Sequence, residues 1–303
     1  MDNIGMPNVS DIAKVGEATT GFVGAVNRLL PGISLRSIQK ANSKTTKLIL
    51  SDLKRISEWG AELGLSDETI RELQSDAVKR HRRTVNLAGV LEYAENEIRD
   101  DADVSCVEDD WLESFHDHAE KVSNPDVQVI WGKLIAGEIN NPGTYSKRLM
   151  SVISDMSTTD AQSFSTLCSL SIQSIVPQNE NGGIKVAKQP LALLFEDDNS
   201  GTFDEGAFSY EQRIALEAYG LIDSSVRNRF NISPNKAAAF LAMEKVVLFK
   251  NNGDSPVELS FSPVFTEIGV ELSSLCSGIG SSKSLKTALI KTAEEEKLEL
   301  VIQ

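Results

Sequence analysis

Apolar residues recur at three- and four-residue spacing through the first half of the chain, which predicts a series of amphipathic helices. The first stripe covers residues 10–30 and is followed by Pro31-Gly32, a typical helix stop. A second helix is predicted over residues 34–60. A third is predicted from Ser66, because a Ser followed by two acidic residues suits the positive end of a helix.

A dense segment from Asp110 to Leu149 continues this helical pattern. One helix is predicted from about Asp110, and another begins at Asn124-Pro125, where proline occupies the first helical position. Asn141-Pro142-Gly143 is typical of a turn. Two further helices are expected after it, the second running from about Thr158 to about Ile172.

Beyond Val176 the pattern changes to short apolar runs separated by Gly, Asn, Asp and Ser, which favours strands and turns. Strands are predicted over 226–232, 246–250 and 257–261, and helices over 205–219, 264–275 and 284–297. We therefore expect a mainly α protein. Its predicted parts are an N-terminal helical region (1–78), a central helical bundle (79–176), a smaller α+β domain (177–280) and a C-terminal helix with a tail (281–303).

Charge is distributed unevenly along this acidic chain, whose net charge is −14. Residues 28–83 contain 12 Lys/Arg and 7 Asp/Glu, whereas residues 92–126 contain 2 Lys/Arg and 13 Asp/Glu. We expect these segments to pair within the fold or across a homo-oligomer interface, and the alternative is that the basic segment binds an anionic partner. The candidate surface for that partner comprises Arg36, Lys40, Lys44, Lys47, Lys54, Arg55, Lys79, Arg80, Arg82 and Arg83.

The sequence favours a soluble cytoplasmic protein. Its three cysteines, Cys106, Cys168 and Cys276, lie far apart in the sequence and show no disulfide or zinc spacing. No signal peptide or run of 18 apolar residues is present. Residues 10–30 are expected to dock on a core or a sister subunit, with association at a membrane surface as the weaker alternative.

No arrangement of residues indicates catalysis. Glu113 and His116 have the Glu-x-x-His spacing of di-iron bundles, but such a site needs a second copy and the chain has only three histidines. The Gly-Ser-rich segment before Lys283 lacks the glycine of a phosphate-binding loop. We therefore expect no cofactor, no metal and no catalytic site, and lean towards a protein that is not an enzyme.

Glu138 is the single most informative residue, because it follows Trp131 by seven positions and so lies on or beside the buried face of its helix. A buried carboxylate needs a partner. We predict a structural lock formed by Glu138, Arg148, Trp111, Trp131 and Gln128, in which Glu138 pairs with Arg148 or caps neighbouring backbone. One of the basic residues 80–83 is the alternative cation.

The same segment resembles a bacterial family catalogued as domain of unknown function 2806. The similarity rests on an Asp-Trp opening, a Gln-x-x-Trp, an Ala-Gly-Glu, a Pro-Gly and a Ser-x-Arg. These are Asp110-Trp111, Gln128, Trp131, Ala136-Gly137-Glu138, Pro142-Gly143, Ser146 and Arg148, with Phe115, Ala119, Ser123 and the lead-in Arg82-Arg83-x-x-Asn86. The resemblance covers residues 80–170 closely and implies a soluble bacterial or prophage-borne protein, of a kind that often serves in phage defence or stress.

Two functions therefore stand as hypotheses. The first is a non-enzymatic, self-associating scaffold or sensor, an accessory factor in phage defence or stress. The second is a nucleic-acid-associated regulator that uses the basic helices or a winged-helix-like C-terminal domain, suggested by residues 219–222 and 266–272. The acidic net charge disfavours the second.

Overall fold

A computed structural model describes residues 35–99, 101–177, 184–194, 202–203, 208–276 and 279–303, with side chains from Ile49 onward except at 202 and 203. The helix expected over 10–30 lies outside these residues. The chain divides into two compact units, residues 1–150 and 151–303, which we describe separately. The finer four-part division expected from the sequence stays a prediction.

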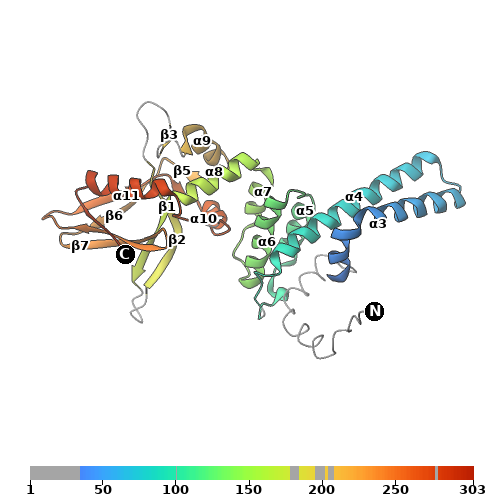
Figure 1. Cartoon of the computed structure of the whole chain (residues 1–303), viewed down its shortest axis with the longest axis horizontal. Helices are drawn as coiled ribbons and strands as arrows, with labels where there is room; N and C mark the ends of the chain where they lie inside the picture. Colours follow the sequence, from blue (N-terminus) through green and yellow to red (C-terminus); the bar gives the residue numbers. More distant parts are fainter. Residues whose placement is uncertain (1–34, 100, 178–183, 195–201, 204–207, 277–278) are drawn as a thin grey trace, which may run out of the picture. The chain divides into compact units, whose positions relative to one another are not determined.

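Two long helices form an antiparallel hairpin in the first unit (Figure 1). They are α3 (Leu35–Glu62) and α4 (Asp67–Ala94), and both match predicted helices. Ser66 caps α4 by accepting a hydrogen bond from the Thr69 N–H, as its sequence context indicated. Of the residues described between 49 and 85, Gly60 alone is fully buried, because its missing Cβ lets Ile70 lie directly against α3. This part of the hairpin therefore has almost no core of its own.

The second half of α4 packs against α5 (Asp109–Ala119) and α6 (Pro125–Asn140). The short 3-10 helix η1 (Val104–Cys106) precedes α5, and α7 (Lys147–Asp155) follows the turn after α6. Asn124 caps α6 and Pro125 is its first residue, which confirms the prediction. Gly132 permits close packing on α4, since a Cβ there would lie 2.9 Å from the Val90 carbonyl oxygen.

The second unit is built on a seven-stranded sheet in the order β11-β8-β7-β1-β2-β10-β5, in which neighbouring strands are antiparallel. Two further strand pairs, β3-β4 and β6-β9, lie outside this order. The strands are β1 (Ser171–Pro177), β2 (Ile184–Ala192), β3 (Thr202–Phe203), β4 (Phe208–Ser209), β5 (Ile222–Asp223), β6 (Asn228–Ile232), β7 (Lys236–Ala242), β8 (Lys245–Asn251), β9 (Val257–Phe261), β10 (Val264–Phe265) and β11 (Glu299–Ile302).

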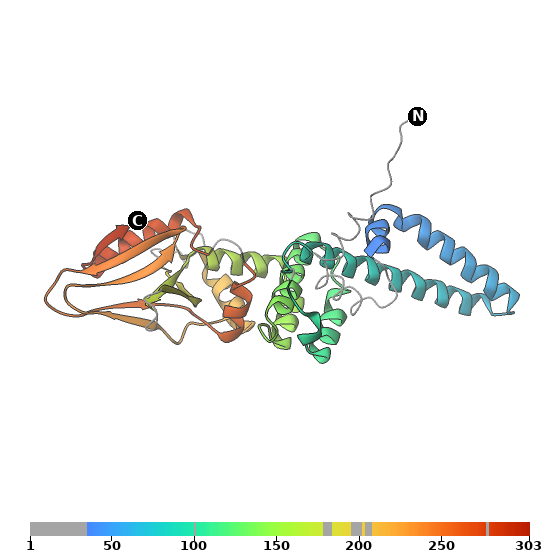
Figure 2. The same ribbon diagram turned by 90° about the horizontal axis from the view of Figure 1, so that it is seen from below.

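Within the described residues of this unit, the helices that accompany the sheet are α8 (Thr158–Ser169), α9 (Tyr210–Ala218), α10 (Glu267–Ser273) and α11 (Lys283–Glu295). Figure 2 shows α11 lying along the strands. Its Leu285 and Leu289 enter a core that also contains Phe240 and Phe249 of the sheet and Phe261 of the β6-β9 pair. The Phe240 and Phe261 ring centroids lie 5.5 Å apart, so one aromatic cluster joins these elements.

The expectation of a mainly α protein with a small β part was wrong. The chain is about 53% helix and 22% strand, and the sheet organises its C-terminal half. The helix predicted up to Ile172 ends at Ser169, and β1 begins at Ser171. Residues 264–265 are a strand that precedes the shorter helix α10. Strand β7 was missed because its three consecutive alanines show no period-two pattern.

Asp160 holds the start of α8 and makes the stability of the second unit depend on pH. It forms a capping box with Ser157 and accepts a hydrogen bond from the Tyr219 hydroxyl. Hydrogen bonds from Ser157, and also from Tyr219, lower the pKa of the Asp160 carboxyl below its usual value of 3.8. The ionised form therefore stabilises the fold above the unfolded-state pKa, and this contribution is lost as pH falls through the lower folded-state value.

We expect Asp160→Ala to destabilise the second unit by about 1 kcal/mol at neutral pH, the usual cost of losing a cap. The difference from wild type should narrow as the pH falls below 3.8 and through the lower folded-state pKa, where the carboxyl becomes protonated in the folded state as well. Thermal unfolding followed by circular dichroism across this range would measure it. Asp155→Ala removes a nearby exposed carboxylate and is the control, and an Asp160→Ala effect that did not change with pH would contradict the assignment.

Candidate functional site

The Glu138 carboxylate is buried in the first unit and is bound by backbone N–H groups. It accepts hydrogen bonds from Gly143 N–H at 2.6 Å and Tyr145 N–H at 2.9 Å. Both donors belong to the turn that follows α6, and Gly143 adopts a positive φ of 82° there. The carboxylate therefore clamps the Asn-Pro-Gly turn onto the end of its own helix.

Tyr145 extends this clamp to α5. Its carbonyl oxygen accepts a 2.7 Å hydrogen bond from Trp111 Nε1, and Trp111 stacks on Phe115 with ring centroids 5.6 Å apart. Gly137 makes room for the tyrosine, because a Cβ at this position would lie 2.7 Å from the Tyr145 ring. One buried acid, one turn and one indole thus join α5 and α6.

Gln128 forms a second bridge, between α6 and the segments around it. Its Nε2 donates to the Val122 carbonyl oxygen at 2.9 Å and, more weakly, to that of Asn86 at 3.4 Å. Gly89 leaves space for this amide, since a Cβ there would lie 2.6 Å from Gln128 Oε1. Asn86 in turn donates to the Glu120 carbonyl oxygen at 2.9 Å. These amide hydrogen bonds join neighbouring segments inside the first unit.

Of the five residues of the predicted lock, Glu138 and Trp111 are linked through Tyr145, whereas Gln128 forms its own separate bridge. Trp131 is buried in the core of unit 1, 5.6 Å from the Phe115 ring, and its Nε1 has no hydrogen-bond partner among the described residues. Arg148 is exposed and forms no ion pair with Glu138 within the described part of the chain. The Glu138 carboxylate therefore caps neighbouring backbone N–H groups instead of pairing with Arg148.

The basic residues of the predicted anionic-partner surface lie along the hairpin, and several are paired. Lys54 contacts Glu58 at 3.7 Å, and Arg55 contacts Asp52 at 2.7 Å while its guanidinium lies over the Trp59 ring. These pairs are exposed and each contributes little to stability.

On α4, Lys79 contacts Asp76 at 3.4 Å, and Arg83 contacts Glu120 at 3.3 Å. Arg80 and Arg82 are exposed. Arg36, Lys40, Lys44 and Lys47 lie on α3, but their side chains are outside the described residues.

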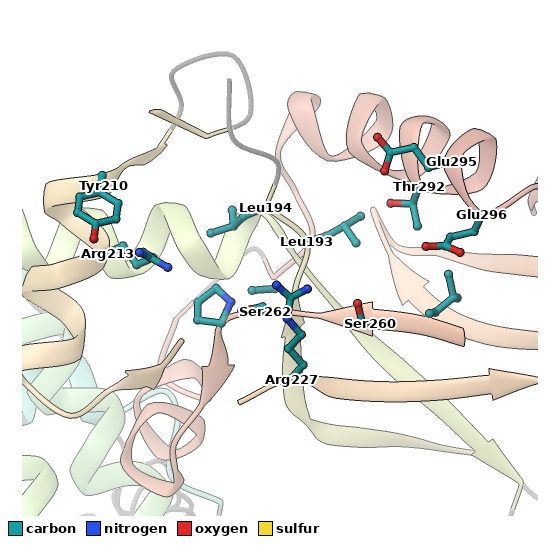
Figure 3. A pocket seen from close by; sticks show the side chains of 13 residues that line it. Leu193, Leu194, Tyr210, Arg213, Arg227, Ser260, Ser262, Thr292, Glu295 and Glu296 are labelled. Carbon is teal, nitrogen blue, oxygen red and sulfur yellow. The ribbon is translucent and has the colours of Figure 1, made fainter. Parts of the chain in front are cut away.

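An open cleft of about 450 Å3 lies in the second unit (Figure 3). Arg213 on α9 and Arg227, just before β6, stand on one side, and Glu295 and Glu296 at the end of α11 stand on the other. The remaining lining residues are Ala192, Leu193, Leu194, Tyr210, Leu259, Ser260, Ser262, Pro263 and Thr292. This volume suits a small molecule.

Sequence reasoning missed this cleft, because its lining comes from five separate parts of the chain and none of them carries a motif. Among the described residues, no group of three or more His, Cys, Asp or Glu could hold a metal ion. Glu113, His116 and His118 lie on α5, and His118 tilts over the Trp131 ring with centroids 6.0 Å apart. No helix within the described ranges is long and apolar enough to span a membrane.

Cys168 and Cys276, widely separated in the sequence, meet in the second unit. Cys168 is buried at the end of α8, and Cys276 follows α10. The hydrogen bond with the Cys276 thiol, together with burial, raises the pKa of the Cys168 thiol well above its ordinary value. Both effects disfavour the thiolate, so Cys168 is a structural rather than a nucleophilic cysteine.

We expect Glu138→Gln to destabilise the first unit by about 1–3 kcal/mol, because one of the two N–H groups loses its acceptor inside the protein. Arg148→Ala should change the free energy of unfolding by less than about 0.5 kcal/mol, as for other exposed positions. Urea denaturation followed by tryptophan fluorescence would measure both. Equal destabilisation by the two substitutions would show that an ion pair, and not the backbone, holds the carboxylate.

Iodoacetamide should modify the exposed Cys106 quickly and the buried Cys168 slowly in the folded protein, since the Cys168 thiol is both inaccessible and hard to deprotonate. Peptide mass spectrometry over a time course would give both rates. In urea the two rates should converge, which serves as the control. Equal rates in the folded protein would contradict the placement of Cys168.

Comparison with known proteins tests the family resemblance of the segment from Asp110 to Leu149. The model of a family described as a protein of unknown function, DUF2806, matches residues 71–288. No curated protein and no solved structure gives a match. The family match covers most of the chain and confirms the resemblance read from the Trp111–Arg148 segment. The chain therefore belongs to the DUF2806 family.

Proposed function

We propose that the protein is a non-enzymatic scaffold that associates with a second copy of itself through the α3–α4 hairpin. The observation that supports this most directly is the exposure of large apolar side chains on a hairpin with little core. Leu63 is 75% exposed and Trp59 is 57% exposed, at and near its tip. Among the described side chains, the other exposed large apolar residues of the hairpin are Leu50, Leu65, Leu73, Val78 and Tyr93.

Trp59, Leu73 and Val78 lie on the helices beside the seam where α3 and α4 meet, and Leu63 and Leu65 lie in the connection between the two helices. The seam repeats at three- and four-residue intervals through Leu53, Ile56 and Gly60 of α3, whose partners on α4 include Ile70. Trp59 precedes a seam position and remains uncovered by α4. Two hairpins packed side by side form a four-helix bundle, the usual way for such helices to bury their apolar flanks.

The charge along the hairpin favours an antiparallel second copy as the occupant. The tip segment, residues 58–76, contains six Asp/Glu and one Arg. The two flanking segments, residues 49–57 and 77–83, together contain one Asp and six Lys/Arg. We call these two flanking segments the base of the hairpin. When two hairpins lie antiparallel, the acidic tip of each contacts the basic base of the other, and a two-fold axis creates this contact twice.

The second candidate function is binding to a nucleic acid, which the cluster of exposed arginines at residues 80–83 favours. A net charge of −14 opposes it. A bacterial accessory role in phage defence or stress is the cellular setting that we propose for the scaffold, and identification of the neighbouring genes would test it.

We expect the full-length protein to form a dimer or larger assembly, measured by size-exclusion chromatography with light scattering over a wide concentration range. Trp59→Glu combined with Leu63→Ser should shift it towards the monomer, because both side chains are exposed and their loss leaves the fold intact. Ile184→Ser is the matched control, since Ile184 is 73% exposed but lies in the second unit.

A charge-swap experiment separates the antiparallel arrangement from other modes. One variant reverses the tip (Glu62→Lys, Glu72→Lys) and the other reverses the base (Arg80→Glu, Arg82→Glu). Each alone should associate less than wild type, and an equimolar mixture should regain association. A wild-type protein that stays monomeric, or reversed variants that associate as wild type does, would overturn the proposal.

Measuring the binding of duplex DNA and of RNA at low salt tests the second candidate function, which is binding to a nucleic acid. Binding that is lost on base reversal but retained in the Trp59→Glu, Leu63→Ser variant would favour nucleic acid over self-association.

A further inference from the structure

The thiols of Cys168 and Cys276 lie side by side in the second unit, although residues 169–275 separate them in the sequence. Cys168 is buried in the last turn of α8, and Cys276 is partly exposed just after the end of α10. A hydrogen bond joins the two thiols. A disulfide requires two cysteines whose side chains point towards each other, and a thiol–thiol hydrogen bond satisfies that requirement.

Main-chain hydrogen bonds hold the end of α8 against the segment that follows Cys276. The Gly280 N–H donates to the Cys168 carbonyl oxygen at 3.1 Å. The Ser282 N–H donates to the Ser169 carbonyl oxygen, also at 3.1 Å. The backbone of Cys168 is therefore fixed on the segment that leads from one cysteine to α11.

The other cysteine is anchored by α10. The Cys276 N–H donates to the Ser273 carbonyl oxygen at 3.1 Å, and the neighbouring side chains of Leu272 and Leu275 are buried. The folded backbone on both sides of the contact thus keeps the two sulfur atoms close.

The two thiols differ in their access to reagents. The hydrogen bond with Cys276, together with burial, raises the pKa of the Cys168 thiol. An external oxidant therefore reacts first at the more accessible Cys276. Cys168 then reacts only with its neighbour, where proximity offsets its small thiolate fraction.

We propose that Cys168 and Cys276 form a reversible disulfide when the protein meets a low-molecular-weight disulfide such as oxidised glutathione. The Cys276 thiolate attacks one sulfur of the oxidant, forms a mixed disulfide and expels one molecule of glutathione. The Cys168 sulfur then attacks the Cys276 sulfur and expels the second molecule. The protons of the two protein thiols pass to the two released thiols, so one disulfide is reduced as the other forms.

This modification goes beyond the proposed self-association and does not depend on it, because both cysteines belong to the second unit. The disulfide closes a loop that contains every strand from β1 to β10. A bond that closes so long a loop restricts the unfolded chain strongly. The oxidised second unit should therefore unfold at a higher temperature than the reduced one.

Disulfide mapping of the full-length protein tests the proposal. The protein is equilibrated with mixtures of oxidised and reduced glutathione, blocked with iodoacetamide in acid-quenched denaturant, and digested without reduction for peptide mass spectrometry. We expect the Cys168–Cys276 peptide pair to be at least about tenfold more abundant than any pair that includes Cys106. Dithiothreitol should reverse the link, and circular dichroism should show a thermal midpoint several degrees higher in the oxidised protein.

Variants and denaturant supply the controls. Cys106→Ser should form the same link and show the same rise in thermal midpoint, because Cys106 belongs to the first unit. Cys276→Ser should show neither. In urea the preference for the Cys168–Cys276 pair should disappear, because the folded backbone no longer holds the two thiols together.

Two results would overturn the proposal: no Cys168–Cys276 disulfide at any ratio of oxidised to reduced glutathione, or pairs with Cys106 that are equally abundant in the folded protein. Both are measured on the wild-type chain, so neither depends on how a variant folds. Neither bears on the hairpin, because self-association is measured by light scattering with variants of the first unit.

Discussion

The buried carboxylate of Glu138 is the constraint on which the signature half of the molecule depends. A carboxylate removed from water is tolerated when hydrogen-bond donors replace its hydration. Here two backbone N–H groups of one turn do so, which obliges the chain after α6 to reverse at a fixed place. The reversed turn then presents the Tyr145 carbonyl oxygen to Trp111.

The family signature is therefore mainly a description of packing. Gly137, Glu138 and Gly143 serve the same turn, and Gln128 with Asn86 satisfies backbone carbonyls between helices. These residues are taken up by contacts inside the first unit, so the proposed functions are assigned to other, exposed residues.

Much of the helical half could be predicted from sequence, because helix signals are local. Ser66, Asn124 and Pro125 act through groups within four residues of themselves, and all three occupy the predicted positions. The backbone partner of Glu138 was among the alternatives, but nothing local could choose between it and Arg148. That choice depends on how the turn at Gly143 closes.

The sheet half was underestimated because strand order and pairing are non-local. Strand β11 pairs with β8, and β10 joins β2 to β5 across long stretches of sequence. The alanines of β7 and the start of β1 directly after α8 carry no pattern that separates strand from helix. The cleft could not be predicted from the sequence for the same reason, because its lining residues come together only when α9, α11 and β9 are packed in the fold.

The order of charge along the hairpin is the argument behind the proposed self-association. Where the acidic and basic segments adjoin, they already pair within one chain, as Lys54 does with Glu58 and Lys79 with Asp76. These exposed local pairs contribute little to stability. An α-helix rises about 1.5 Å per residue, so a carboxylate near the turn, such as Glu62, lies too far along the hairpin from Arg80 and Arg82 for a direct ion pair. In the proposed antiparallel arrangement a second hairpin of reversed polarity neutralises these more distant charges.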